Sequence, residues 1–324
     1  MTTRCRQSVV ASAVTMIILY AAAKPPEIDA QQRTTAPFYL RNAIIPLNEI
    51  HGGGPPKDGI PAITDPTTIE AVEASYLNDS DPVVGVAMGD EHRAYPLRIL
   101  VYHEIVNDTL NDIPIAVTYC PLCYSIVVFD RRVGEKTVEF GVSGLLYNSN
   151  VLMYDREGRP ESLWSQMAGQ GVSGPGASRA LKTLPVELTT WRDWQTRYPN
   201  SSVLSNRTGY QRDYQTNPYR SYFAGANLMF PVRPMSRRLS GKTLVLGVWS
   251  DEEARAYPLS TFAPNGEMLE QELDGKRFQL VYDDDERTLR ISSADEGLQW
   301  MYSFWFAWYA FRPHTEISNG PSQE

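Results

Sequence analysis

The sequence predicts an α+β fold that is mainly β and contains an internal duplication of a β-rich unit. First, Val-Val-Gly-Val at residues 83–86 and Arg-Ala-Tyr-Pro-Leu at 93–97 recur at 245–248, as Val-Leu-Gly-Val, and at 255–259, with a constant offset of 162 residues. Second, β-branched and aromatic runs surround the most distinctive motif of the chain, as expected for buried strands. Third, 42% hydrophobic and 11% aromatic residues are typical of a globular protein with a core.

The N-terminus has the pattern of a secretory signal peptide over residues 1–23. Arg4 and Arg6 precede an apolar run over residues 9–23, which ends in three alanines. We therefore expect export to the periplasm or the cell exterior. The apolar run is short for a spanning helix, which needs about 20 residues, so an uncleaved membrane anchor is the alternative. Residues 24–68, rich in Pro, Gly and Asp, predict an irregular segment.

The first β unit, residues 69–205, carries a Cys-Pro-Leu-Cys motif at 120–123. Strand-forming runs at residues 115–119 and 126–129 flank it, so both cysteines are expected in a tight turn between strands. Redox Cys-x-x-Cys pairs usually lie where a strand meets a helix, whereas a turn between strands is typical of a metal-binding knuckle. A disulfide across so short a loop would be a weak structural staple.

The duplication provides an internal control for this motif. The second copy has Asp283, Asp284 and Asp285 where the first has the cysteines, and a Pro-Asn-Gly turn at 264–266 where the first has His103. The repeated fold therefore does without these residues, which favours a functional role for them. Cleavage of the signal would remove Cys5 and leave the motif as the only thiols.

The leading hypothesis is a transition-metal site. We predict that Cys120, Cys123 and His103 bind zinc or copper, and that Met153 or Met167 supplies a further soft ligand if the ion is copper. Two thiolates and one imidazole would leave an open coordination position, as a catalytic or ligand-exchanging site needs.

Glu104 is the candidate catalytic acid or base. It could act as a general base or orient His103, or it could form an ordinary ion pair with Arg93 or Arg98. Neighbouring residues point to opposite faces of a strand, so His103 and Glu104 share a site only on a turn or a helix.

Two other classes of function fit the same residues. In a thiol-disulfide protein Cys120 attacks and Cys123 resolves, and Tyr119 and His103 tune the thiolate. In a binding module for a small molecule or a glycan, Trp and Tyr patches form the site and the disulfide is inert. The sequence does not decide whether the protein is an enzyme.

The rest of the chain is expected to support this site. Residues 206–240, polar and rich in tyrosine, predict an irregular connector that covers a pocket. Residues 241–316 form the second β unit, expected to be a scaffold that supplies a pocket wall, because three adjacent carboxylates are best left in water. Residues 317–324 are a tail.

Several long motifs resemble one known family. They are His103–Asp108, Tyr119–Cys123 and Phe140–Asn150, with further likeness at residues 162–166 and 304–308. Together they are similar to an exported prokaryotic family catalogued as domain of unknown function 3179, over residues 82–316. The resemblance implies export but no particular activity.

The charge balance excludes one class of partner. The net charge of −8 and a pI near 5.2 argue against a nucleic-acid-binding protein, which needs a basic face. Polybasic runs for binding a membrane surface are also missing, so we expect membrane attachment only through an uncleaved N-terminal segment. No partner is indicated by name.

Overall fold

The computed structural model describes residues 38–156, 159–260, 262 and 268–318. The predicted signal peptide and the Pro-Asn-Gly turn at 264–266 lie outside these residues, as does most of the predicted tail. Strands make up 43% of the structure and helices 12%, which confirms a mainly β fold. Within the described residues no helix is long and apolar enough to cross a membrane.

The largest sheet has nine strands and combines both β units. Its order is β2-β6-β7-β8-β23-β18-β19-β24, with β15 also paired to β8. Tyr302 on β23 faces Ile126 on β8, so the first and second units share one continuous sheet. The strands are β2 (Ile63–Thr64), β6 (Ile105–Leu110), β7 (Ile113–Cys120), β8 (Ser125–Asp130), β15 (Thr183–Leu184), β18 (Leu244–Trp249), β19 (Ala254–Pro258), β23 (Gln299–Phe304) and β24 (Glu316–Ile317).

Two five-stranded sheets are formed mainly by the first unit, and β1 joins one of them from the segment that precedes this unit. One has the order β16-β4-β5-β17-β3 and the other β1-β11-β12-β13-β14. Their strands are β1 (Ile50–Gly52), β3 (Thr68–Glu70), β4 (Pro82–Met88), β5 (Glu91–Pro96), β11 (Phe140–Tyr147), β12 (Asn150–Asp155), β13 (Leu163–Ser165), β14 (Gln170–Ser173), β16 (Glu187–Thr190) and β17 (Ser202–Leu204). A small ribbon pairs β9 (Arg132–Val133) with β10 (Lys136–Thr137).

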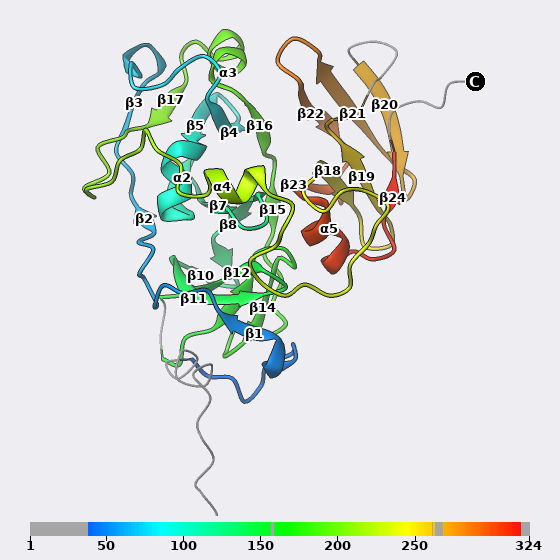
Figure 1. Cartoon of the computed structure of the whole chain (residues 1–324). Helices are drawn as coiled ribbons and strands as arrows, with labels where there is room; N and C mark the ends of the chain where they lie inside the picture. The colour runs from blue at the N-terminus through cyan, green and yellow to red at the C-terminus, as the bar shows by residue number, and fades with distance from the viewer. Residues whose placement is uncertain (1–37, 157–158, 261, 263–267, 319–324) are drawn as a thin grey trace, which may run out of the picture.

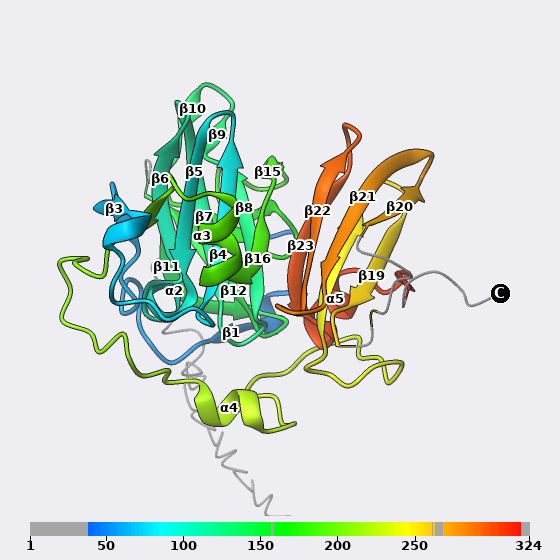
Figure 2. The ribbon, with the colours of Figure 1, turned by 90° about the horizontal axis from the view of Figure 1, so that it is seen from above.

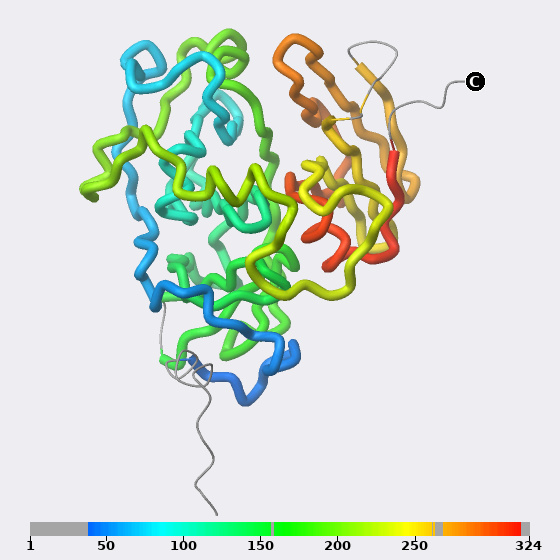
Figure 3. Tube along the Cα trace, viewed as in Figure 1, coloured from blue at the N-terminus to red at the C-terminus, as the bar shows by residue number. Residues whose placement is uncertain are grey.

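The second unit lies beside the first (Figure 1; Figure 2 shows the same arrangement from above). It adds a three-stranded sheet of β20 (Met268–Leu273), β21 (Lys276–Asp283) and β22 (Thr288–Ala294). Figure 3 traces the connector at residues 206–240 as it crosses from the first unit to the second. This connector contains α4 (Arg220–Ala224); the other helices are the 3₁₀ turns η1 (Leu47–Glu49) and η2 (Ala71–Glu73), and α2 (Leu97–His103), α3 (Trp191–Arg197) and α5 (Trp305–Phe311).

The repeated motifs adopt the same local structure. In β4 and β5, Gly85 faces Ala94, and in β18 and β19, Gly247 faces Ala256, with neighbouring pairs in identical register. In the first unit, β4 also pairs with β16, which runs directly into the short helix α3. In the second unit, β18 also pairs with β23, which runs directly into the short helix α5. The same hydrophobic alternation and turn spacing thus fold in the same way at both places.

A tryptophan packs on the repeated glycine in both units. A Cβ atom added to Gly85 would lie 2.1 Å from the Trp194 ring, and one added to Gly247 would lie 2.2 Å from the Trp308 ring. Both rings are fully buried. Only glycine allows the strand backbone and the indole to approach this closely.

Candidate functional site: a buried thiol pair

The two cysteines lie in the tight turn between antiparallel strands β7 and β8. Cys120 ends β7 and faces Ser125, the first residue of β8. The backbone N–H of Cys123 donates to the carbonyl of Cys120 at 3.2 Å, and Tyr124 follows with a positive φ of 49°. The predicted turn between strands is therefore present.

Both thiols are free and enclosed by protein. The exposed fraction is 1% for Cys120 and 0% for Cys123. The turn between β11 and β12 closes over them: the Ser149 carbonyl oxygen lies 3.2 Å from Sγ of Cys123 and 4.0 Å from Sγ of Cys120. A reagent or partner can reach the sulfurs only after this part of the protein opens.

The surroundings of the two sulfurs shift the pKa values of the two thiols in opposite directions. Burial by itself raises the pKa of the Cys120 thiol, but the neighbouring Cys123 side chain and the backbone N–H groups of Cys123, Val151 and Leu122 stabilise its thiolate, and the net effect lowers this pKa. Burial and the neighbouring Cys120 raise the pKa of Cys123 well above its usual value. Of the two thiols, Cys120 is therefore the one that loses its proton more readily.

Glu104 lies next to this pair and has no ionic partner among the described residues. It directly follows the last residue of α2, has a φ of 57°, and is buried with an exposed fraction of 7%. No hydrogen bond or ion pair to its carboxylate is found within the described part of the chain. Burial, with a smaller contribution from Cys120, raises the pKa of Glu104 well above its usual value.

The alternative ion pairs suggested for Glu104 are not formed. Arg93 pairs with Asp108 at 2.7 Å, and Arg98 pairs with Asp81 at 2.5 Å. Glu104 therefore remains a candidate for chemistry at the thiols.

His103 is fully buried but is engaged away from the sulfurs. Its Nδ1 lies 2.7 Å from the carbonyl oxygen of Pro61, and its Nε2 lies 2.7 Å from the hydroxyl of Tyr214. Burial lowers the pKa of His103, so the neutral ring is favoured. Among the residues that the structure describes, no three His, Cys, Asp or Glu side chains are placed to hold a metal ion together.

Both candidate methionine ligands lie in the core around the thiols. Met153 and Met167 are fully buried in the same hydrophobic cluster as Cys120 and Cys123. Met153 lies on β12, two residues after Val151, on the face of the strand that packs in this cluster. The backbone N–H of Met167 donates to the side chain of Asn150 at 3.2 Å.

The connector and the second unit cover the thiol turn. The Tyr222 hydroxyl on α4 donates to the carbonyl of Leu122, inside the Cys-Pro-Leu-Cys turn, at 2.8 Å. From the second unit, the backbone N–H of Phe304 donates to the carbonyl of Cys123 at 2.7 Å. The rings of Phe304 and Tyr124 pack with their centroids 5.3 Å apart.

Sequence reasoning about the cysteines did not identify the residues that surround them. Asn150 donates its side-chain amide to the Ser125 hydroxyl at 3.0 Å and to Gln166 at 2.8 Å, and its amide also lies beside Cys123, where it opposes the rise in the pKa of that thiol. The Ser149 hydroxyl is buried and has no hydrogen-bond partner in the described residues. The motif that ends at Asn150 is visible in the sequence, but nothing in it indicates that it packs against the Cys-Pro-Leu-Cys turn.

The aspartates that the sequence repeat aligns with the cysteines lie at an acidic turn in the second unit. Strand β21 ends at Asp283, and the turn to β22 contains Asp284, Asp285 and Glu286, followed by Arg287 with a φ of 52°. Asp284 and Asp285 are exposed to solvent. Glu286 instead accepts a hydrogen bond from Thr190 at 2.7 Å, so this turn contacts the first unit.

Comparison with known proteins identifies a family for this chain. A family model described as "Protein of unknown function (DUF3179)" matches residues 57–299, which is more than half of the chain. No curated protein and no solved structure matches.

Proposed function

The chain belongs to the DUF3179 family of proteins of unknown function, and from the geometry of its thiol pair we propose that it is a thiol-disulfide redox protein. The observation that supports this most is that the two buried sulfurs are free, lie in one tight turn against the same Ser149 carbonyl, and differ in the direction in which their surroundings shift the pKa. Unequal thiols of this kind suit the roles of attacking and resolving cysteine.

The proposed reaction reduces a disulfide substrate. The Cys120 thiolate attacks one substrate sulfur, the substrate S–S bond breaks, and the second substrate sulfur leaves with the bonding electron pair and takes up a proton. Cys123 then releases its proton and attacks Sγ of Cys120, which breaks the mixed disulfide and frees the first substrate sulfur as a thiolate. Two electrons pass to the substrate and the protein is left with a Cys120–Cys123 disulfide. The reverse sequence oxidises a dithiol.

Glu104 is the acid that we assign to proton transfer in this reaction. Its carboxyl group is buried beside Cys120 and has no competing partner within the described residues, and its raised pKa favours the protonated form. It can therefore give a proton to the departing substrate sulfur and, once ionised, accept the proton that Cys123 releases. His103 serves instead to hold the end of α2 against the connector through Tyr214.

A soft metal ion is the second candidate ligand of the same pair. Two facing thiolates suit Cu(I), which prefers thiolate and thioether ligands, and Met153 lies in the surrounding core. A zinc site with His103 as ligand would require that residue to give up its bonds to Pro61 and Tyr214. Bound metal would block the redox role, so the two candidates exclude each other in the same molecule.

We also propose that the protein is exported and that its two β units arose by duplication. The N-terminal charged, apolar and small-residue pattern supports export. The identical register of the two hairpins, with a tryptophan packed on each repeated glycine, supports duplication. In an oxidising compartment a redox pair would need either a dedicated reductant or the oxidising direction of the reaction.

Trapping of mixed disulfides tests the redox proposal. The Cys123→Ser variant should accumulate a stable mixed disulfide at Cys120 when treated with an oxidised small-molecule disulfide, and Cys120→Ser should form far less, by mass spectrometry. Equal adducts on both variants would contradict the assigned roles. Metal content of protein purified without chelator decides the second candidate: near-stoichiometric copper or zinc that is lost in Cys120→Ser would favour the metal site.

A further inference from the structure

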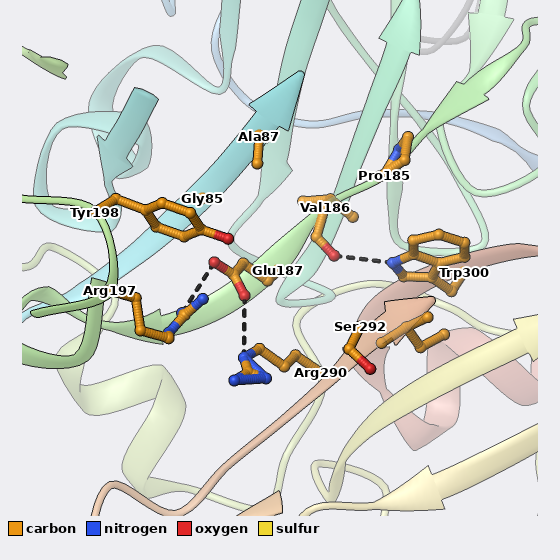
Figure 4. Close-up of a pocket in the computed structure, with 11 residues that line it drawn as sticks. Gly85, Ala87, Pro185, Val186, Glu187, Arg197, Tyr198, Arg290, Ser292 and Trp300 are labelled. Carbon is orange, nitrogen blue, oxygen red and sulfur yellow. Dashed lines mark hydrogen bonds and ion pairs between the residues drawn. The ribbon is translucent and has the colours of Figure 1, made fainter. Parts of the chain in front are cut away.

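A pocket of about 420 Å³ lies between the two units and is separate from the thiol turn. Strands β4 and β16 and the end of α3 line it from the first unit, and β22 and β23 line it from the second (Figure 4). Its volume is in the range of small-molecule sites, which often form where two units meet. Nothing in the proposed redox reaction uses it.

The charges at the pocket balance. Glu187 pairs with Arg197 at 2.9 Å and with Arg290 at 3.5 Å, and Arg197 also pairs with Asp193 at 2.7 Å. All four side chains are largely buried, with exposed fractions from 12% to 22%. Asp193 does not itself line the pocket, but it pairs with Arg197 next to it. The cluster of two guanidinium groups and two carboxylates therefore has no net charge and offers little attraction for a free anion or cation.

Several polar groups at the pocket still have free bonding capacity. Within the described residues, neither the hydroxyl of Tyr198 nor the terminal nitrogens of Arg290 have a hydrogen-bond partner. The Glu187 carboxylate has lone pairs beyond those used by the two arginines. The site can therefore both donate and accept hydrogen bonds within a small volume.

Aromatic surface completes the lining. The Trp300 indole nitrogen donates to the Val186 carbonyl at 2.9 Å, which fixes the ring at the pocket. Figure 4 shows Trp300 on one side of the pocket, Tyr198 on the other and Glu187 between them. The Tyr198 ring is held in turn by His92, with ring centroids 4.3 Å apart.

We propose that this pocket binds a neutral sugar. Each sugar hydroxyl can donate a hydrogen bond to Glu187 and accept one from Arg290 or Tyr198. The planar carboxylate and guanidinium groups can each hydrogen-bond two neighbouring hydroxyls at once. The C–H face of a sugar ring suits an indole surface such as that of Trp300. The proposal rests on this pocket alone and does not depend on the redox function.

Ligand-observed NMR and titration calorimetry test this with glucose, galactose, mannose and N-acetylglucosamine as neutral probes, and glucuronate as an anionic comparison. We expect saturable binding of at least one neutral probe at millimolar concentration or below. Tyr198→Phe keeps the ring contacts and removes only the free hydroxyl, so it should weaken binding by about fivefold. Arg290→Gln, which leaves Glu187 paired with Arg197, should weaken it by more than about tenfold.

The control variants separate sugar binding in this pocket from binding elsewhere on the protein. Tyr39→Phe, at an exposed tyrosine outside the pocket, and Cys120→Ser should leave sugar binding unchanged. Thermal unfolding of each variant shows that it is folded. The proposal is overturned if no neutral probe binds at millimolar concentration, if binding survives unchanged in both pocket variants, or if glucuronate binds better than glucose and does so in a salt-dependent way.

Discussion

The hydrogen bond from Tyr222 to Leu122 should control access to the thiols. At 2.8 Å this bond ties α4 of the connector directly to the carbonyl in the middle of the Cys-Pro-Leu-Cys turn. Because Cys120 is only 1% exposed, an alkylating reagent reacts only in molecules where this cover has opened. The informative change is Tyr222→Phe, which keeps the ring that Lys242 contacts at 3.4 Å and removes the hydroxyl alone.

The size of the effect follows from the bond that is lost. One neutral hydrogen bond contributes about 1 kcal/mol net, so its loss should raise the population of the open form about fivefold. If closing is faster than the chemical step, the alkylation rate of Cys120 rises by the same factor. The overall free energy of unfolding should fall by about 1 kcal/mol or less.

Iodoacetamide labelling of the reduced protein, followed by mass spectrometry over time, measures this rate. Tyr219→Phe is the matched control, because it lies on the same segment and its hydroxyl has no hydrogen-bond partner in the described residues. The reasoning is refuted if the two variants label at the same rate, or if Tyr222→Phe labels no faster than the parent protein. Labelling that tracks global unfolding in denaturant would equally show that α4 is not a local gate.

Two further predictions concern stability. Gly247→Ala should destabilise the protein by about 1–3 kcal/mol in denaturant unfolding, because the new Cβ lies 2.2 Å from the Trp308 ring and forces the ring to shift. Gly241→Ala is the control, since its Cβ would meet nothing closer than 3.8 Å. Equal effects of the two changes would contradict the packing argument. At Asp130, burial raises the pKa but hydrogen bonds from Arg132 outweigh it and lower the pKa below its usual 3.8. Folding therefore favours the ionised form of Asp130. The contribution of this carboxylate to the free energy of unfolding is present above pH 3.8 and is lost as the pH falls through the lowered pKa. The stability difference between the parent and Asp130→Asn should therefore shrink on acidification below this value, and a constant difference would argue against the ion pair.

Local structure at the repeated motifs and at the thiol turn was predictable from the sequence. Alternating apolar residues and turn residues act over a few positions, and they define the hairpins that contain Gly85 and Gly247 whatever lies around them. The same holds for the Cys-Pro-Leu-Cys turn, since its flanking runs are long enough to pair as strands without help from distant parts of the chain.

The surroundings of the thiols were decided by tertiary structure alone. His103 lies within 20 residues of the cysteines in the sequence, yet its ring bonds to Pro61 and Tyr214, because the end of α2 faces the connector. Asn150 and Tyr222 reach the thiol turn from far along the chain. Which distant segments meet depends on how whole sheets bury their faces against one another, and a pattern of neighbouring residues carries no information about that choice. The sequence therefore determined the two thiols and their turn. The packing of the turn between β11 and β12 determined that the pair is buried and unequal, and the packing of the connector and second unit determined that it is covered.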